Sequence, residues 1–371
     1  MRRLSPLLFV LGMLLAPSPA TAQERPALEP NATATFDFLD VGQGDAILIR
    51  SPEGKTALID AGPSKEIVPT LRNLGVRSID LVVVTHHHVD HYGGMDDVIR
   101  AFHPRIFLAT DSSHTTPTYL KLLTLVRDSG MQAIIPTDVP RKIELGSVVL
   151  TVLPQPPEDR KDENDNSIGI RLQNGSFSAL LTGDSEAGER TFWEANCPDL
   201  LRDCTVLKLA HHGSRNGTDA RWLGIVRPRL AVASLGAGNG FGHPHAQTLA
   251  LLERREIPLL RTDLDGTVSI QSDGKRWEIV GPGRVARGPP VRHDPGAASS
   301  RSTPDIRTNS ARLIDINSAT QEELESLPGV GPVIARHIIE GRPYRSADDL
   351  RRVKGIGEKR FSEIRPHVTV R

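Results

Sequence analysis

Short runs of β-branched or alternating residues recur through the first two thirds of the chain and constrain its fold more than any other feature. Each run ends at Gly, Asp, Pro or Asn, as strands commonly do. Amphipathic stretches such as "TYLKLLTLVRDSG" lie between some of them and predict helices. This order predicts an α/β sandwich, two sheets flanked by helices. The predicted strands are "ATFDFLDV", "DAILIR", "KTALIDAG", "IDLVVVT", "RIFLAT", "SVVLTVL", "SIGIRLQ", "FSALLTGD", "CTVLKLA", "RLAVASLG", "TVSIQS" and "RWEIV".

The length of 371 residues accommodates one large domain and a smaller module. From Pro282 to about Arg312 the chain is rich in Pro, Gly, Ser and Arg and poor in apolar residues, which indicates a flexible linker. We therefore expect a first domain over residues 31–281, a linker over 282–311 and a small helical domain over 312–371.

The first residues are typical of an export signal. Arg2 and Arg3 precede an apolar stretch, Leu7 to Leu15, and the small residues "ATA" precede Gln23. We predict a signal peptide over residues 1–22 and a periplasmic or extracellular mature protein. A membrane anchor is the alternative, although the stretch is shorter than the ~20 residues that a span needs. No later segment is apolar enough to be expected to cross a membrane.

The two cysteines, Cys197 and Cys204, lie in one predicted loop. In an oxidising compartment we expect them to form a disulfide. Two free thiols are the alternative.

The charge is zero overall but unevenly divided. From Pro282 to the end there are 16 Lys or Arg against 11 Asp or Glu, so residues 23–281 are net negative. An acidic body suits cations, and a basic tail suits a polyanion.

The sequence "VVVTHHHVDHYGG", residues 82–94, places four histidines and an aspartate directly after a predicted strand. His86, His88, Asp90 and His91 form the pattern H-x-H-x-D-H. Imidazoles and carboxylates are the ligands of zinc-like divalent cations, so we predict a metal site. A polar loop with a chance histidine cluster is the alternative. His87 is expected to point away from its neighbours.

Two later segments carry similar side chains at the ends of predicted strands, "LLTGDSE" with Asp184 and "LKLAHHGS" with His211 and His212. A further segment, "GHPH", offers His243 and His245. Loops at strand ends commonly build the active sites of α/β proteins.

Together with "LDVGQGDAILI" and "ALIDAG", these motifs resemble the metallo-β-lactamase fold family and, within it, the nuclease-like domain of the ComEC competence proteins. The resemblance spans roughly residues 35–280. It implies an αββα sandwich and a hydrolase with two divalent metal ions, zinc or manganese.

The resemblance also implies the site residues. One cation would be bound by the first and third histidines of the run and the other by the Asp-His pair that follows, with a later aspartate bridging. The implied ligands are His86, His88, Asp90, His91, Asp184 and His211, with His212 as the alternative to His211. The implied catalytic residues are Asp90 or Asp184, which would orient the nucleophile, and His243, which would ligate a metal, contact phosphate or, when protonated, assist the leaving oxygen.

Three further aspartates, Asp40, Asp45 and Asp60, would lie beside the metals. Asp60 would orient a ligand histidine. Turn capping is the alternative for Asp40 and Asp45.

The chain departs from the family pattern in one respect. Many members supply a third histidine to the first metal between the positions of His91 and Asp184, whereas here this interval holds only His103 and His114, in other settings. The segment "ENDNSIGIRL" takes that place, and one of Asn164, Asp165 and Ser167 is expected to face the site. This departure argues against β-lactamase or thioesterase activity.

The tail, residues 313–370, resembles the helix-hairpin-helix DNA-binding domain of ComEA proteins through its turns "LPGVG" and "VKGIG". Glycines there expose backbone N–H groups that bind phosphate without reading bases. Packing of helices or binding of protein is the alternative. The expected DNA contacts are Gly329, Gly331, Gly355, Gly357, Arg351, Arg352, Lys354, Lys359 and Arg360.

These features predict an exported metal-dependent DNA nuclease or phosphodiesterase with a sequence-independent DNA-binding tail. One alternative is a hydrolase of small phosphoesters or lactones that the tail tethers to DNA or a surface. The other is a DNA-binding protein without enzymatic activity.

Overall fold

The computed structural model describes residues 28, 33–113, 116–158 and 162–280, and in the C-terminal part residues 314–319, 324, 327, 330, 332–357, 360–361 and 364–370. The predicted signal peptide and linker lie outside these residues, as do Gly329, Gly331 and Lys359. Among the described residues, no helix is long and apolar enough to cross a membrane. The chain divides into two compact units, residues 1–286 and 287–371.

The first unit contains two sheets. The strands of the first sheet are β1 (Ala34–Phe38), β2 (Ile47–Arg50), β3 (Thr56–Ile59), β4 (Leu81–Val84), β5 (Ile106–Ala109), β6 (Gln132–Ile134), β14 (Val268–Ser272) and β15 (Trp277–Val280). Those of the second are β7 (Arg141–Leu145), β8 (Val148–Val152), β9 (Ile170–Asn174), β10 (Phe177–Leu181), β11 (Val206–Lys208), β12 (Leu230–Ala233) and β13 (Leu259–Arg261).

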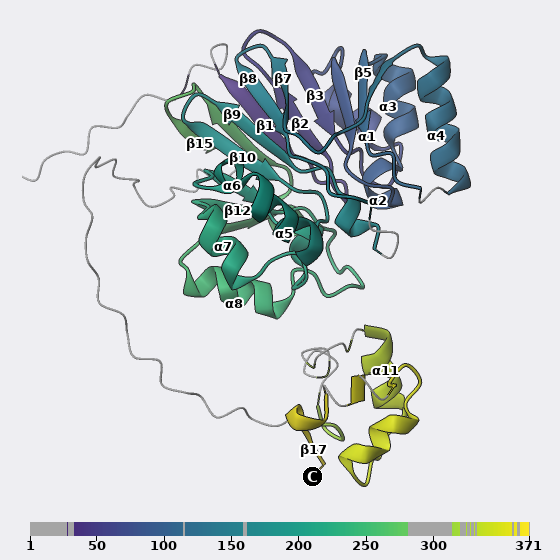
Figure 1. The fold of residues 1–371 in the computed structure, drawn as a ribbon. Coiled ribbons are helices and arrows are strands. Elements are labelled where there is room, and N and C mark those ends of the chain that lie inside the picture. Colours follow the sequence, from purple (N-terminus) through teal and green to yellow (C-terminus); the bar gives the residue numbers. More distant parts are fainter. Residues whose placement is uncertain are drawn as a thin grey trace, which may run out of the picture. The chain divides into compact units, whose positions relative to one another are not determined.

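The strand orders place parallel strands together in each sheet. The first sheet runs β15-β14-β1-β2-β3-β4-β5-β6 and the second β13-β12-β11-β10-β9-β8-β7 (Figure 1). β3 to β6 are parallel, and so are β10 to β13. The carboxyl ends of parallel strands lie at one edge of a sheet, so the loops that follow them gather there.

The main core lies between the two sheets. Phe36 of β1 stacks on Phe177 of β10 with ring centroids 4.7 Å apart, and both side chains are buried. Val83 and Val232 belong to the same apolar cluster. Every second residue of these strands thus faces the partner sheet, as the alternating runs predict.

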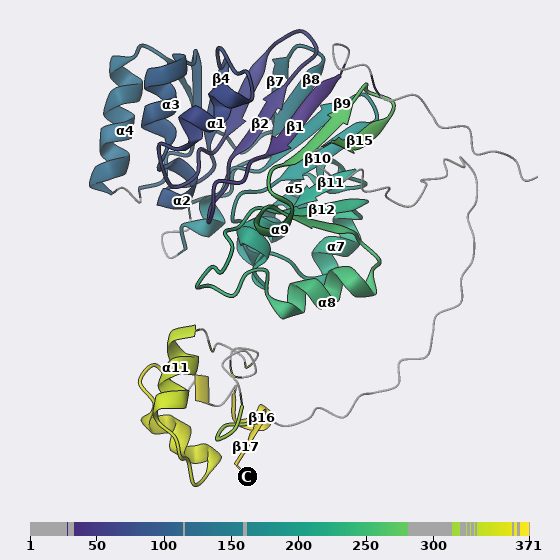
Figure 2. The ribbon, with the colours of Figure 1, turned by 180° about the vertical axis from the view of Figure 1, so that it is seen from behind.

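Helices cover the outer face of each sheet (Figures 1 and 2). The first sheet packs against α1 (Ile67–Asn73), α3 (Met95–Phe102) and α4 (Pro117–Asp128). The second packs against α5 (Ala187–Asn196), α6 (Pro198–Leu201), α7 (Ala220–Val226) and α8 (Ala246–Arg254). Short helices α2 (Val89–Tyr92), α9 (Thr262–Asp265), η2 (Asn164–Asn166) and η3 (Ala210–Gly213) lie in the connections. The four layers confirm the predicted αββα sandwich.

The structure contradicts the expected disulfide. Cys197 and Cys204 are both free and buried. Arg171 Nη1 donates to the Sγ of Cys204 at 3.2 Å, and this thiol donates to the carbonyl of Leu201 at 3.5 Å. Burial raises the pKa of each thiol to about 11. Helix α6 separates the two cysteines, and the Cys204 thiol has other partners.

The second unit is small and mainly helical. It contains α11 (Pro332–Glu340), η4 (Ala347–Arg352) and η5 (Arg365–His367), and the parallel pair β16 (Ile314–Asp315) and β17 (Val368–Thr369) joins its two ends. Its own core includes Leu327, Ile338, Leu350 and Ile364. A separate core of this kind is what a distinct domain requires.

Candidate metal centre

The histidine run leaves β4 and is held by Asp60, which follows β3. Thr85 donates to the Asp60 carboxylate through its backbone N–H at 2.8 Å and its hydroxyl at 2.7 Å. The same carboxylate lies 2.8 Å from Nδ1 of His91. Asp60 has a φ of 58°, which turns its backbone sharply at the strand end. Asp60 thereby orients His91 so that its Nε2 lies 3.3 Å from Asp184 Oδ1.

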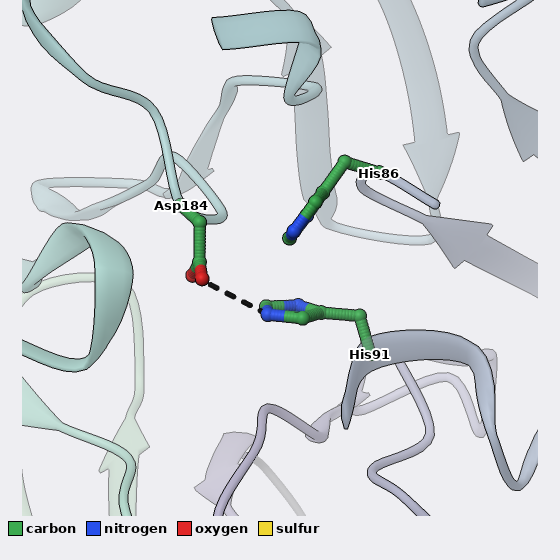
Figure 3. Close-up of side chains that lie close together, drawn as sticks. All are labelled: His86, His91 and Asp184. Atoms are coloured by element: carbon green, nitrogen blue, oxygen red, sulfur yellow. Dashed lines mark ion pairs between the residues drawn. The ribbon is translucent and has the colours of Figure 1, made fainter. Parts of the chain in front are cut away.

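Three of the expected ligands, His86, His91 and Asp184, converge (Figure 3). Their ligating atoms lie within 4.8 Å of one another, and all three residues are buried. His91 Nε2 is 3.3 Å from Asp184 Oδ1. His86 and His91 follow β4 of the first sheet, and Asp184 follows β10 of the second. The group therefore forms where strand ends of the two sheets meet.

A second group of donors shares His91 with the first. It joins Asp90 and His91 to His212, which follows β11. His212 Nε2 is 3.2 Å from Asp90 Oδ2 and 3.4 Å from Asp184 Oδ2. Its Nδ1 lies 2.8 Å from the carbonyl oxygen of Ser234, which can only accept a hydrogen bond, so Nδ1 carries the proton and donates. Without an added proton, His212 therefore presents the lone pair of Nε2 to the acidic residues.

The structure places His212, rather than the expected His211, in the donor groups. His211 is a quarter exposed, and its Nδ1 lies 3.0 Å from Glu186 Oε1. Its Nε2 is 4.0 Å from Asp184 Oδ2. Both histidines have positive φ, 50° and 55°, and this left-handed turn directs His212 inward. His88 lies beside the first group, with Nδ1 3.0 Å from His86 Nε2.

Lys208 lies in this cluster, although no sequence motif assigned it a role. Its side chain is fully buried on β11. Its ammonium group forms an ion pair with Asp45, donates to the carbonyl of Gly183 at 3.3 Å and lies 3.8 Å from Asp184 Oδ1. Burial alone would lower the pKa of Lys208, but Asp45 and Asp184 raise it. A charged residue within the apolar run "TVLKLA" is the sequence signal that could have identified it.

The protonation states of the donors follow from burial and neighbouring charges. Burial, reinforced by the charge of His91, lowers the pKa of His86 well below its ordinary value. Burial would also lower the pKa values of His91 and His212, but Asp184 and the other carboxylates raise both well above 6.5. Burial favours protonation of Asp90, yet His212 outweighs it and lowers the Asp90 pKa to about 2. The cluster thus combines ionised carboxylates with imidazoles.

The donor set fits a divalent cation. His91 Nε2 and Asp184 Oδ1 are buried and pair with each other at 3.3 Å, but within the part of the chain that the structure describes neither atom makes a hydrogen bond. Buried polar atoms that make no hydrogen bond are rare and call for a ligand or ion. Mixed imidazole and carboxylate donors are the ligands of zinc and similar metals.

The structure gives the other two expected aspartates, Asp45 and Asp40, different positions. Asp45 is buried within the cluster and lies 3.5 Å from His212 Nδ1 and 3.8 Å from His91 Nδ1. Asp40 is exposed, and its carboxylate accepts a hydrogen bond from the N–H of Gly42 at 3.2 Å. Asp40 therefore caps a turn, which was its alternative role.

The segment in place of the third histidine supports the site through the backbone. Asp165 accepts hydrogen bonds from the N–H groups of Glu186 at 2.7 Å and Gly188 at 3.2 Å, so it caps the start of α5 instead of facing the cluster. Ser167 Oγ accepts a bond from the N–H of Asp184 at 3.1 Å. Asn164 lies in η2, where its Oδ1 is buried. Of the three residues of which one was expected to face the site, Asp165 has its carboxylate engaged in capping α5, and Ser167 contacts the backbone of Asp184.

His243 lies beside the cluster, whereas His87 points away from it. His243 lies 5.4 Å from His211 between ring centroids. Burial, together with His211 and His245, lowers the His243 pKa to about 3, which favours the neutral imidazole. Ligation, phosphate contact and assistance to the leaving oxygen stay predictions for this residue. His87 points away, as predicted, and stacks on Tyr119 with ring centroids 3.8 Å apart.

In the C-terminal unit, the second Gly-rich turn is ordered by close packing. Gly355 has a φ of 96°, and a Cβ there would lie 3.2 Å from Ile334 Cγ1. Arg351 lies 4.1 Å above the ring of Phe361, and Arg352 lies 5.3 Å from that of Tyr344. The remaining expected DNA contacts within the described residues are Gly357, the exposed Lys354, and Arg360, which donates to the carbonyl of Gly355.

Comparison with known protein families agrees with this architecture. Residues 39–237 match the metallo-β-lactamase superfamily, and residues 309–369 match a helix-hairpin-helix motif. The chain belongs to the metallo-β-lactamase superfamily and carries a C-terminal helix-hairpin-helix motif.

Its relatives match the two units separately. ComE operon protein 3 of Bacillus subtilis is 28% identical over 62% of this chain and 32% of its own length. Competence protein ComA of Neisseria gonorrhoeae is 29% identical over 66% of this chain and 33% of its own length. ComE operon protein 1 of Bacillus subtilis is 43% identical over 16% of this chain and 31% of its own length. The chain thus spans about a third of the length of the curated relatives it matches.

Proposed function

We propose that this protein is a metal-dependent phosphodiesterase that cleaves DNA, which its C-terminal unit holds by the phosphate backbone. The observation that carries the proposal is the pair of overlapping donor groups, buried except for half-buried Asp90, that share His91 and are joined through Asp184. Shared donors of this kind suit two neighbouring cations. The similarity of the two units to competence-related relatives supports nucleic acid as the substrate.

The residues that would hold the cations come from both sheets. When bound, two divalent cations would neutralise a phosphodiester and lower the pKa of an attacking water. The set comprises His86, His88, Asp90, His91, Asp184 and His212.

The chain's own residues would orient the reacting groups. Asp60 fixes the ring of His91, and the Ser234 carbonyl fixes that of His212. The ionised carboxylates of Asp90 and Asp184 would accept hydrogen bonds from the attacking water. Lys208 offsets the negative charge of Asp45 and Asp184 in the buried site.

The C-terminal unit would contribute binding without base recognition. The backbone N–H groups at Gly355 and Gly357 would contact phosphate, and Lys354 and its arginine neighbours would add positive charge. Such binding is indifferent to sequence and weakens as salt rises. We also propose export to the periplasm or the cell exterior, on the basis of the signal-like residues 1–22.

The direct test is cleavage of plasmid and linear DNA by the full-length protein with Zn²⁺, Mn²⁺ or EDTA. We expect metal-dependent cleavage that His88→Ala abolishes and that His103→Ala, an exposed histidine outside the cluster, leaves intact. Lys354→Gln should weaken DNA binding and reduce the salt slope by about one. Intact DNA under every metal would reject the nuclease function, and hydrolysis of small phosphoesters or lactones would then identify the alternative.

A further inference from the structure

One exposed aromatic side chain lies on a loop beside the donor groups. Phe241 is 57% exposed, the one aromatic among the exposed large hydrophobic residues in the described part of the chain. Val89, 52% exposed, lies between His88 and Asp90 in the histidine run. Two apolar side chains thus remain in solvent next to residues of the cluster, although burying a Phe side chain is normally favourable.

Hydrogen bonds fix the loop that presents Phe241. The side chain of Asn239 donates to the carbonyls of Gly236 at 3.2 Å and His243 at 2.8 Å. It accepts from the N–H groups of Phe241 at 3.2 Å and His243 at 3.0 Å. A Cβ on Gly236 would lie 2.7 Å from the backbone nitrogen of Gln43, so the base of the loop packs tightly on the loop after β1. Phe241 is therefore exposed on an ordered support.

The rings of two histidines lie between Phe241 and the other cluster residues. The ring of Phe241 stacks on His243 with centroids 5.7 Å apart and an interplanar angle of 23°. His243 lies 6.2 Å from His212 between ring centroids. The backbone N–H of Arg215 donates to Nδ1 of His245 at 3.0 Å on the same side. The aromatic face of Phe241 is thus connected to the donor groups through the rings of His243 and His212.

We infer that Phe241 is a platform on which an unpaired nucleobase stacks, so that the site receives single-stranded or frayed DNA in preference to paired duplex. The inference rests on the proposed function. Every base has an aromatic face, so a Phe platform recognises a strand without reading its sequence. In duplex DNA the bases stack on one another, and a base must leave the stack before it contacts Phe241.

The test compares full-length His88→Ala protein with the double variant His88→Ala/Phe241→Ala, so that no strand is cut. The probes are a single-stranded oligonucleotide and the same strand with abasic nucleotides. Phe241→Ala should weaken binding of the normal strand by about 5- to 150-fold and leave that of the abasic strand unchanged. Phe241→Trp should retain binding, whereas Phe241→Leu, which is apolar but lacks an aromatic face, should not.

Equal binding of the normal strand by both proteins overturns the inference. An equal loss for the normal and abasic strands also overturns it, because Phe241 would then only organise the loop. The C-terminal unit is identical in all variants and cancels from the comparison. In the chain with His88 intact, DNA cleavage with an unchanged KM in Phe241→Ala rejects stacking and leaves the nuclease function standing. Base-dependent binding without any cleavage rejects the nuclease function alone.

Discussion

At the scale of single residues, the centre depends on a buried cation that belongs to the chain itself. Lys208 pairs with Asp45 and lies 3.8 Å from Asp184, and both carboxylates are buried. Taking three charges out of water is costly unless they compensate one another. Lys208 therefore keeps the carboxylates ionised and in position when no metal is bound.

Replacing Lys208 with methionine leaves two buried carboxylates without their partner. We expect the free energy of unfolding in EDTA to fall by about 3–5 kcal/mol, measured by urea denaturation. Lys275→Met, at an exposed lysine of the same unit, is the control and should change stability by less than about 0.5 kcal/mol. A loss of similar size in both variants would show that Lys208 has no compensating role.

The histidines of the centre predict how metal binding depends on pH. Burial opposes protonation of His91 and His212, but the carboxylates raise both pKa values well above 6.5 in the metal-free protein. A cation must displace these protons, so metal affinity should rise with pH between about 6 and 8, with release of protons. Calorimetric titration in buffers of different ionisation enthalpy measures both quantities. An affinity that is constant across this range would contradict the assignment of these ligands.

At the scale of elements, the sequence predicted all the strands that carry the site, because each is a continuous apolar run that ends at a polar residue. In the first unit, the strands that it missed are β6, β7 and β13, and in the second unit it missed the short pair β16 and β17. β6 and β13 are three-residue strands whose side chains are mostly exposed or half-buried, and β7 alternates exposed charged residues at a sheet edge. None of these strands carries a cluster residue.

From residue spacing alone, the site was predictable only where its residues are adjacent in the sequence, whereas Asp60 and Asp184 followed from the family resemblance. The spacing of His86 to His91 indicated a metal site directly. The choice between His211 and His212 depended on a left-handed turn, and Lys208 meets Asp45 only after the two sheets pack. Contacts between distant strands leave no periodic pattern, so the sequence could not assign them.

The turn after β10 offers a test of how the elements set the site. Gly183 has a φ of 50°, and a Cβ there would lie 2.9 Å from Ser167 Oγ and 3.0 Å from Thr85. Gly130 has a similar φ of 69° with nothing within 4 Å of its Cβ. Gly130→Ala should therefore cost only the conformational penalty of about 1–2 kcal/mol, and Gly183→Ala should cost more. Equal losses in urea denaturation would show that packing at Gly183 is unimportant.

At the scale of the whole molecule, the chain joins an acidic unit that suits cations to a basic segment that suits a polyanion. The two units have separate cores, and they match different relatives. The donor groups belong entirely to the first unit, and the Gly-rich turn belongs to the second. The proposed two-metal site is therefore a property of the first unit, and its metal content is measurable in the intact chain.

The most direct measurement is the metal content of the purified full-length protein after equilibration with Zn²⁺ or Mn²⁺, by elemental mass spectrometry. We expect two metal ions per chain. The metal affinity of both sites should fall in Asp184→Ala, because this carboxylate contacts both donor groups. His103→Ala should bind as much metal as the wild type. A wild-type protein that retains no metal, or an Asp184→Ala variant with full metal content, would contradict the proposed two-metal site.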